Sequence, residues 1–207
     1  MGYDEPAKRL IEELCALLTA EPIETLRLRL RPFRVSDLPD LYEYLAQPEQ
    51  RRLSGNCEFN SLDNARAVLD RILDPERPPH SFAVVLKDES KVIGNLSVGR
   101  YPFLENDPIL RELRGVCLSY VLNENYWRRG LMTELLRAVY PVLFERGKLA
   151  YIQSGYFDFN AASAALQRKL GMRLWTEEEF DLNGESVHTK EMILFREEFE
   201  KNGGFRS

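Results

Sequence analysis

A single glycine between a strand pattern and a helix pattern restricts the fold of this chain more than any other feature. Residues 116–122 are apolar and rich in β-formers, and from Leu131 onward the apolar residues recur at helical spacing. Between these segments, Arg128 and Arg129 directly precede Gly130. A strand, a tight turn and a helix start leave backbone N–H groups pointing at open space, which predicts an anion-binding turn. On these residues alone, a plain tight turn with solvated arginines remains an open alternative.

The spacing of the glycines excludes two common phosphate-binding motifs. A dinucleotide-binding fingerprint needs glycines at three set positions, and a nucleotide P-loop ends in Gly-Lys-Ser or Gly-Lys-Thr. Neither pattern surrounds Gly130. What remains is a compact turn in which Gly130 lets the backbone close around a bound group while neighbouring amides and arginines supply positive potential. A nucleotide enzyme, which would also need an acidic metal-binding motif, is disfavoured, and no metal is expected.

The charge balance and the cysteine usage limit the partners and the compartment. The chain has 28 basic and 33 acidic residues, a net charge of −5, which argues against a nucleic-acid partner. No apolar run is long enough to span a bilayer, and the first residues carry charges instead of the apolar core of a signal peptide. The three cysteines form no Cys-x-x-Cys pair and no even set, as is usual in a reducing compartment. We expect a cytoplasmic protein that binds neither nucleic acid nor membrane.

The hydrophobic patterns predict an α/β (α+β) protein with one mixed sheet and helices on both faces. Strict alternation over residues 25–33 predicts a half-exposed strand whose leucines, Leu26 among them, share the buried face. Pro141 interrupts a helical pattern and should kink or break that helix. The polar segment 46–60 is expected to be a connection that lines a substrate cleft. The predicted helices cover residues 6–19, 36–45, 62–73, 131 onward and 160–171, and the other strands cover residues 81–86, 91–101, 116–122, 149–157, 174–182 and 185–195.

Three motifs occur in the order found in the GNAT superfamily of N-acetyltransferases: TLRLRLRPF, YVLNENYWRRGLMTELL and NAASAALQRKLGM. The chain most resembles the ribosomal-protein N-acetyltransferase branch, over roughly residues 24–195. The resemblance implies the GNAT fold, a mostly antiparallel sheet in which the strands 116–122 and 149–157 run parallel and splay apart. It also implies acetyl-CoA as the acyl donor and an amine as the acceptor. Residues 23–200 are then the acetyltransferase domain, and residues 1–22 are a helical extension.

The same resemblance assigns the CoA-binding residues. The turn around Gly130 would wrap the CoA pyrophosphate, with Trp127 and Met132 replacing the commoner end residues of the motif. The strand before the turn would pair with the pantetheine amides. Asn160 would meet the CoA arm, and a plain helix cap is an equally natural role for it. The expected CoA-binding residues are Tyr120, Val121, Leu122, Trp127, Arg128, Arg129, Gly130, Leu131, Met132, Thr133, Asn160 and Ser163.

The resemblance leaves the proton acceptor open. Ser163 matches a hydroxyl that can return a proton to the departing CoA thiolate. The two positions at which relatives often carry a carboxylate hold Cys117 and Gln153, and neither is a base for an amine. Deprotonation would then pass through water to a loop carboxylate, for which the candidates are Glu105, Asp107 and Glu112. A protein that binds acyl-CoA without catalysis, or with little activity, remains the alternative.

The expected reaction transfers acetyl by direct attack of a primary amine, which could belong to a protein N-terminus, an amino acid or a small molecule. Without a tuned base, turnover should rise with pH without a plateau near neutrality. That condition favours an α-amine, with a pKa of about 7.7–8.0, over a lysine-type amine at about 10.4. The predicted helix 6–19 lies outside the resemblance and carries an apolar stripe, Leu10, Leu14, Leu17 and Leu18. A stripe exposed on a monomer would be unfavourable, so we expect a homodimer.

Overall fold

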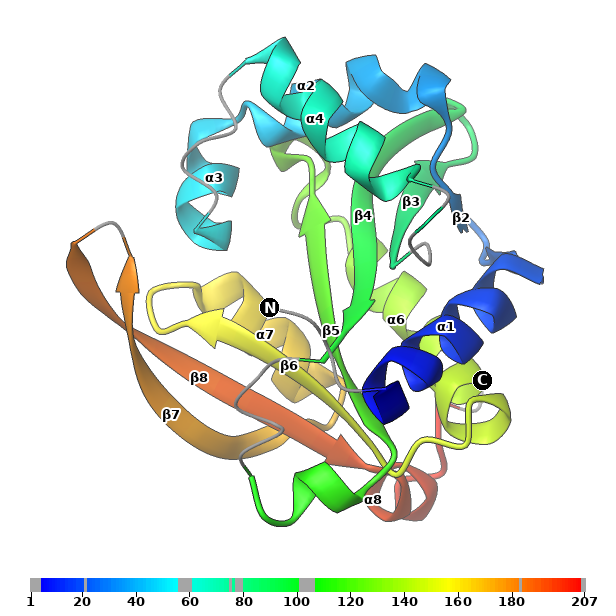
Figure 1. Cartoon of the computed structure of the whole chain (residues 1–207), viewed down its shortest axis with the longest axis vertical. Coiled ribbons are helices and arrows are strands. Elements are labelled where there is room, and N and C mark those ends of the chain that lie inside the picture. Colours follow the sequence, from blue (N-terminus) through cyan, green and yellow to red (C-terminus); the bar gives the residue numbers. More distant parts are fainter. Residues whose placement is uncertain are drawn as a thin grey trace.

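Eight strands form one open sheet in the order β1-β2-β3-β4-β5-β6-β8-β7, which confirms the predicted single mixed sheet (Figure 1). The computed structural model describes residues 5–20, 22–55, 61–74, 76, 80–100, 107–182 and 184–205. The strands are β1 (Ile23–Glu24), β2 (Leu28–Pro32), β3 (Ser81–Leu86), β4 (Lys91–Gly99), β5 (Gly115–Leu122), β6 (Tyr151–Phe157), β7 (Arg173–Leu182) and β8 (Glu185–Phe195). Every neighbouring pair is antiparallel except β5 and β6, which are parallel.

Helices cover both faces of the sheet. A large apolar cluster joins α1 and α6 to one face of the central strands, and a smaller cluster joins α2 and α4 to the other face. Figure 1 shows α2, α3 and α4 together at one end of the molecule and α8 at the opposite end. Among the described residues, no helix is long and apolar enough to cross a bilayer. The helices are α1 (Glu5–Ala20), η1 (Val35–Asp37), α2 (Leu38–Leu45), α3 (Pro48–Ser54), α4 (Leu62–Ile72), η2 (Leu110–Glu112), η3 (Glu124–Tyr126), α6 (Leu131–Pro141), η4 (Val142–Arg146), α7 (Ala161–Lys169) and α8 (Arg196–Lys201).

The apolar stripe of α1 is buried within the chain's own core. Leu10, Leu14 and Leu18 are at most 5% exposed and belong to the same apolar cluster as α6 and the central strands. The helix therefore packs on its own sheet, which covers the stripe without a partner subunit. The stripe gives no reason to expect a second subunit.

Because α1 contributes to the main core, a small cavity in it should lower the stability of the whole domain. Ile11 of α1 is 2% exposed, whereas Ile109 is 55% exposed. We expect Ile11→Val to cost about 1 kcal/mol of unfolding free energy and Ile109→Val to cost under about 0.5 kcal/mol. Chemical denaturation of both variants measures the difference. Equal, small effects would mean that α1 detaches from the domain in solution.

Two local expectations differ from the structure. Leu26 is 87% exposed because it lies in a turn before β2 begins. In this turn the Thr25 N–H donates to the Leu28 carbonyl and the Leu28 N–H donates to the Thr25 hydroxyl, each at 2.9 Å, and the turn projects Leu26 outward. The segment 46–60, expected to be a connection, contains α3. Pro48 starts this helix and Gly55, at φ +72°, ends it, so both helix-end signals were present in the sequence.

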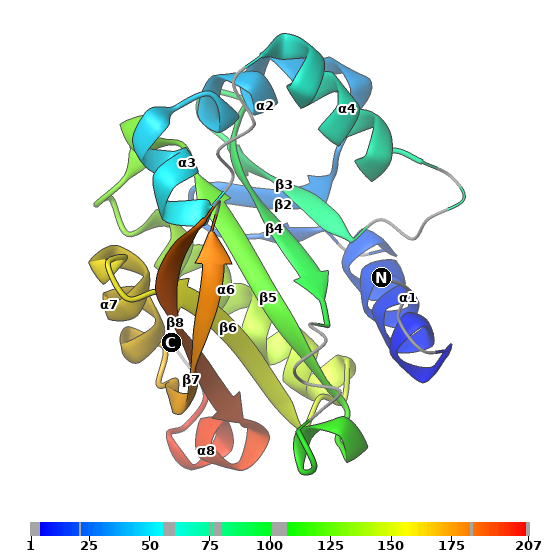
Figure 2. The same ribbon diagram turned by 60° about the vertical axis from the view of Figure 1, so that its left-hand side comes forward.

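The parallel pair β5 and β6 opens the sheet at its centre. The two strands are paired only over Gly115–Cys117 and Tyr151–Gln153, and beyond these residues they separate, as expected (Figure 2). β4 continues to pair with the end of β5, and β8 continues to pair with the end of β6. The predicted disturbance at Pro141 is also present, because α6 ends there and the chain continues as one π-helical turn, Val142–Arg146.

Candidate active site

A cleft of about 1320 Å³ lies where β5 and β6 separate. Its walls include the ends of both strands, the turn before α6, the start of α7, and α3, with further residues from α2, α4, β4, β7 and β8. All of the residues expected to bind CoA line this cleft, with the exception of Arg129. The structure therefore brings together three segments, around residues 120, 130 and 160, that the sequence motifs had linked only by resemblance.

The turn before α6 has the geometry of an anion cradle. Gly130 adopts φ +73° at the N-cap of α6, a conformation that favours glycine. If Gly130 carried a Cβ atom, the nearest atom to it would be the Arg27 Nη2 atom, at 3.9 Å. The space beside the turn is therefore open. The first amides of α6 have no intrahelical acceptor and can donate to a group in that space.

An ion-paired network fixes the turn and the start of α6 to the segment just before β2. The Glu134 carboxylate accepts hydrogen bonds from the Thr25 hydroxyl at 2.5 Å, the Arg27 backbone N–H at 2.9 Å and the Arg27 side chain at 2.7 Å. Burial raises the pKa of Glu134, but these hydrogen bonds and the charge of Arg27 outweigh it, so the pKa lies below its ordinary value. Arg27 also donates to the Arg129 carbonyl at 3.0 Å. Side chains that lie outside the turn itself therefore hold the cradle in place.

Arg129 and Trp127 have structural contacts that the sequence motif did not indicate. The Arg129 guanidinium donates to the Asn125 carbonyl at 2.8 Å and lies over the Tyr126 ring, and Arg129 is not among the described residues that line the cleft. The Trp127 indole donates to the Leu122 carbonyl at 2.7 Å. That bond ties the turn to the end of β5, so the part of the β5 edge left for a ligand is the stretch before Leu122.

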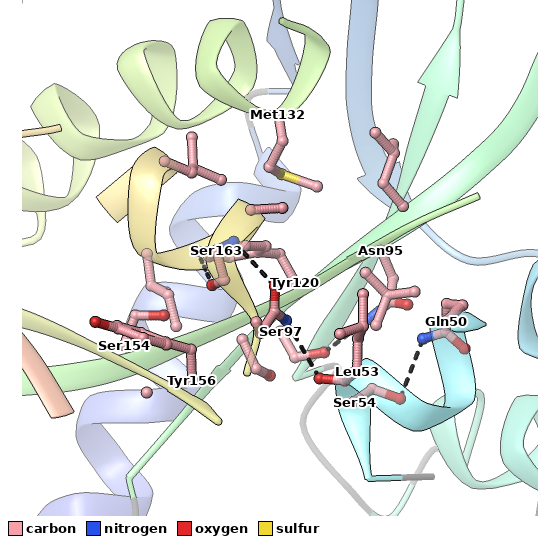
Figure 3. A pocket seen from close by; sticks show the side chains of 18 of the residues that line it. Gln50, Leu53, Ser54, Asn95, Ser97, Tyr120, Met132, Ser154, Tyr156 and Ser163 are labelled. Carbon is pink, nitrogen blue, oxygen red and sulfur yellow. Dashed lines mark hydrogen bonds between the residues drawn. The ribbon is translucent and has the colours of Figure 1, made fainter. Parts of the chain in front are cut away.

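Hydroxyl groups gather at the centre of the cleft. Tyr120 and Ser163 point toward one another (Figure 3). Their hydroxyl oxygens lie 3.1 Å apart. The Gln167 amide nitrogen lies within hydrogen-bond distance of both oxygens, at 3.2 and 3.0 Å, and of the Ser154 hydroxyl at 3.2 Å, and its two N–H groups are shared among these acceptors. Burial raises the pKa of Tyr120 despite these hydrogen bonds, so its phenol stays protonated at neutral pH. Tyr120 and Ser163 together can donate a proton, a pairing that the sequence did not reveal.

Asn160 caps α7, as its position in the sequence suggests, and its side chain also bonds to a second helix. Its side-chain oxygen accepts from the Ser163 N–H at 3.0 Å, which caps α7, and its amide donates to the Leu53 carbonyl of α3 at 3.3 Å. The cap orients the first turn of α7, and the second bond joins α7 to the helix on the opposite wall of the cleft. Asn160 itself lines the cleft.

The structure does not bring Asp107 or Glu112 to the cleft. Glu112 is exposed and paired with Arg111 at 2.9 Å. Asp107 accepts from the Trp175 indole at 2.8 Å and from the backbone amides of Ile109 and Leu110 at the start of η2. Neither is among the described residues that line the cleft. Glu105 lies outside the described residues.

A different carboxylate, Glu191 of β8, lines the cleft. It is 7% exposed and accepts a hydrogen bond from the Gln153 amide at 2.9 Å. Burial raises its pKa to about 7, the hydrogen bond from Gln153 opposes that rise, and the charge of Glu178 adds to it. The sequence signal was available, because a glutamate directly precedes the apolar run MILF of a strand. Only the pairing of β8 with β6, however, places it at the cleft.

Cys117 is a neutral thiol. It is buried, and burial, followed by the nearby charge of Glu191, raises its pKa well above the ordinary value. A protonated thiol is a poor nucleophile at neutral pH. Among the described residues, no group of three or more histidine, cysteine or acidic side chains is arranged to hold a metal ion.

Comparisons with known proteins agree with this geometry. The profile of the acetyltransferase (GNAT) domain matches residues 27–173. The structure is similar to an acetyltransferase of the GNAT family from Bacillus anthracis, with a TM-score of 0.72 at 19% identity over 86% of this chain and 99% of that one. It is also similar to RimL, a ribosomal L7/L12 alpha-N-protein acetyltransferase solved in complex with coenzyme A, with a TM-score of 0.68 at 18% identity over 84% of this chain and 98% of that one.

A third solved structure, the ribosomal-protein-S5-alanine acetyltransferase from Vibrio fischeri, has a TM-score of 0.63 at 20% identity over 84% of this chain and 96% of that one. Among curated proteins, a CCR4-NOT transcription complex subunit 6-like-A from Xenopus laevis is 31% identical over 85 residues, which are 38% of this chain and 16% of that protein. Because the family profile covers most of the chain and the fold agrees with it, the chain belongs to the GNAT family of acyl-CoA-dependent acetyltransferases.

Proposed function

We propose that the chain transfers an acetyl group from acetyl-CoA to a primary amine, and that its acceptor is an α-amine of a peptide, a protein N-terminus or an amino acid. The observation that carries the proposal is that one cleft holds the open turn at Gly130, the unpaired edge of β5 and a proton-donating hydroxyl pair. Acetyl-CoA supplies a thioester whose acetyl carbon is open to attack by an amine. Residues of the protein bind the two substrates and move the protons.

The residues present fit coenzyme A. The amides of the turn and the positive end of α6 suit a pyrophosphate, and Arg128, which lines the cleft, adds charge. From Leu118 to Val121, the side of β5 that faces β6 has no strand partner among the described residues. An extended arm with two amides can pair there as an added strand. Ser163 and Tyr120 then lie beside that arm, where they can give a proton to a departing thiolate.

Direct attack by the amine is better supported than a covalent acetyl-enzyme. In the part of the chain that the structure describes, Cys117 is the cysteine that lines the cleft. Its raised pKa keeps the thiol protonated near neutral pH. The amine must therefore meet the thioester itself. The buried carboxylate of Glu191 also removes the main reason for considering a non-catalytic acyl-CoA-binding protein, which was the lack of any acceptor for the ammonium proton.

The preference for an α-amine comes from matching pKa values. Proton transfer is most effective when donor and acceptor have similar pKa values near the working pH. Glu191, at about 7, lies within about one unit of an α-amine at about 7.7–8.0 and more than three units below a lysine-type amine at about 10.4. The buried free thiols of Cys15 and Cys117 suit a reducing compartment, and we infer a cytoplasmic location.

The proposal is tested by incubating the protein with acetyl-CoA and a panel of amines at neutral pH while free thiol release is measured. The panel contains a peptide with a free N-terminus, the same peptide with a blocked N-terminus and a lysine, free amino acids, and a polyamine. We expect the free N-terminus or a free amino acid to give the fastest release, and the blocked peptide to give much less. Release no faster than thioester hydrolysis with every amine would contradict the proposal.

A further inference from the structure

We infer that Glu191 is the catalytic residue that binds the acceptor ammonium and takes its proton, an assignment that rests on the proposed acetyl transfer. Position is the first support. Glu191 pairs with Gly155 of β6, two residues beyond Gln153, where the pairing of β5 with β6 ends. An arm that starts at Gly130 and follows β5 back toward Cys117 ends at this same point. The thioester and Glu191 therefore meet where the strands separate.

The local packing holds the carboxylate over the sheet. A Cβ on Gly155 would lie 2.5 Å from the Glu191 Oε1 atom, so any larger residue there would displace the carboxylate from its present position. Gln153, itself fully buried, donates one hydrogen bond to the other oxygen at 2.9 Å. Gly155 and Gln153 thus fix the side chain at the cleft wall while leaving acceptor capacity on its oxygens.

The charges around Glu191 suit a cationic ligand. From β5 the neutral thiol of Cys117 faces it, from β6 the Gln153 amide, and from β7 the carboxylate of Glu178, which also lines the cleft. Within the described part of the chain, no arginine or lysine forms an ion pair with Glu191. A buried carboxylate without a cationic partner is unfavourable unless a ligand supplies the positive charge.

The proton balance follows from these positions. The ammonium gives one proton to the Glu191 carboxylate and becomes an amine. The amine nitrogen forms a bond to the acetyl carbon while the carbon–sulfur bond breaks, and the electron pair stays on sulfur. The thiolate takes a proton from the Tyr120 and Ser163 pair, which recovers one from the new amide nitrogen, and Glu191 releases its proton to solvent. The products are an acetamide, the CoA thiol and one proton.

The test compares wild type, Glu191→Gln and Glu177→Gln with two peptide acceptors that differ in the pKa of their N-terminal amine. Glu177 is a control on the neighbouring strand, since it faces the other side of the sheet and pairs with Lys190 at 3.0 Å. In wild type and Glu177→Gln, the acid limb of kcat/KM should have a midpoint near 7 with both peptides. In Glu191→Gln, kcat/KM at neutral pH should fall by at least about 100-fold, and the midpoint should follow the amine of each peptide.

Two readouts do not depend on turnover. With carboxyl-¹³C glutamate, one signal titrating near pH 7 should be present in wild type and absent from Glu191→Gln. Thermal stabilisation by acetyl-CoA should be the same in both proteins, because Glu191 contacts the acceptor and not the CoA arm. Glu178→Gln should move the titration of Glu191 to lower pH, because it removes a nearby negative charge.

The outcomes separate this assignment from the proposed function. Turnover by Glu191→Gln equal to wild type, or a wild-type midpoint that follows the amine of each peptide, would overturn the role of Glu191 and leave acetyl transfer in place. A wild-type protein that acetylates none of the amines would overturn both. The expected result is that Glu191→Gln turns over more slowly than wild type, that the midpoint of its acid limb follows the amine of each peptide, and that its binding of acetyl-CoA is unchanged.

Discussion

Gly130→Asp should bind acetyl-CoA at least about 100-fold more weakly than the wild-type protein. An aspartate places both atoms and a negative charge in the space that the turn leaves open, beside the site proposed for the pyrophosphate. At a concentration about 100 times its dissociation constant, acetyl-CoA should stabilise the wild type by about 2.7 kcal/mol, and most of this should be lost in the variant. Denaturation with and without acetyl-CoA measures the loss.

Gly130→Asn is the matched control for this experiment. Asparagine has nearly the same size as aspartate, carries no charge and tolerates the positive φ of +73°. We expect Gly130→Asn to lose less affinity for acetyl-CoA than Gly130→Asp. The difference between the two variants measures how much of the affinity is electrostatic. Equal stabilisation of wild type and Gly130→Asp by acetyl-CoA would show that the turn does not hold the pyrophosphate.

Glu191→Gln should be more stable than the wild type in alkaline solution, by about 3 kcal/mol. The folded-state pKa of about 7 lies above the ordinary value of 4.5, so ionisation of Glu191 opposes folding. The folded protein holds more protons than the unfolded chain between these values, and wild-type stability therefore falls as pH rises from about 4.5 to 7. A shift of about 2.5 units corresponds to about 3 kcal/mol, at about 1.36 kcal/mol per unit.

Glutamine is nearly isosteric and can still accept the hydrogen bond from Gln153, so the substitution removes mainly the charge. Urea denaturation at pH 5 and pH 8 should show the variant gaining on the wild type at the higher pH. A variant that loses activity and gains stability is expected where a group is retained for function at the expense of folding. Parallel stability curves for the two proteins would mean that Glu191 titrates near its ordinary pKa.

The strand, the turn and the following helix around Gly130 were predictable because each signal is local. Apolar β-formers, a glycine and helical spacing follow one another in a short segment, and backbone conformation alone decides the geometry. The same is true of Asn160, whose cap hydrogen bond spans three residues. Leu26 shows the limit of such reasoning, since the alternating pattern continued into a turn that the neighbouring Thr25 imposes.

Glu191 and the stripe of α1 could not be placed from the sequence because tertiary contacts decide both. An amphipathic pattern shows that Leu14 needs a partner but not whether the partner is the same chain. Glu191 becomes part of the cleft only because β8 crosses to pair with β6, where Gly155 leaves room for its side chain. The loop carboxylate Glu112 was a candidate on sequence position alone, and its side chain is exposed on the protein surface.

A crystal structure of the protein with coenzyme A would locate the ligand relative to the cleft. We expect the pyrophosphate against the amides that follow Gly130, the pantetheine arm along β5 from Val121 toward Leu118, and the sulfur beside the hydroxyls of Tyr120 and Ser163. Coenzyme A bound outside the cleft, or with its sulfur directed away from the point where β5 and β6 separate, would contradict this expectation.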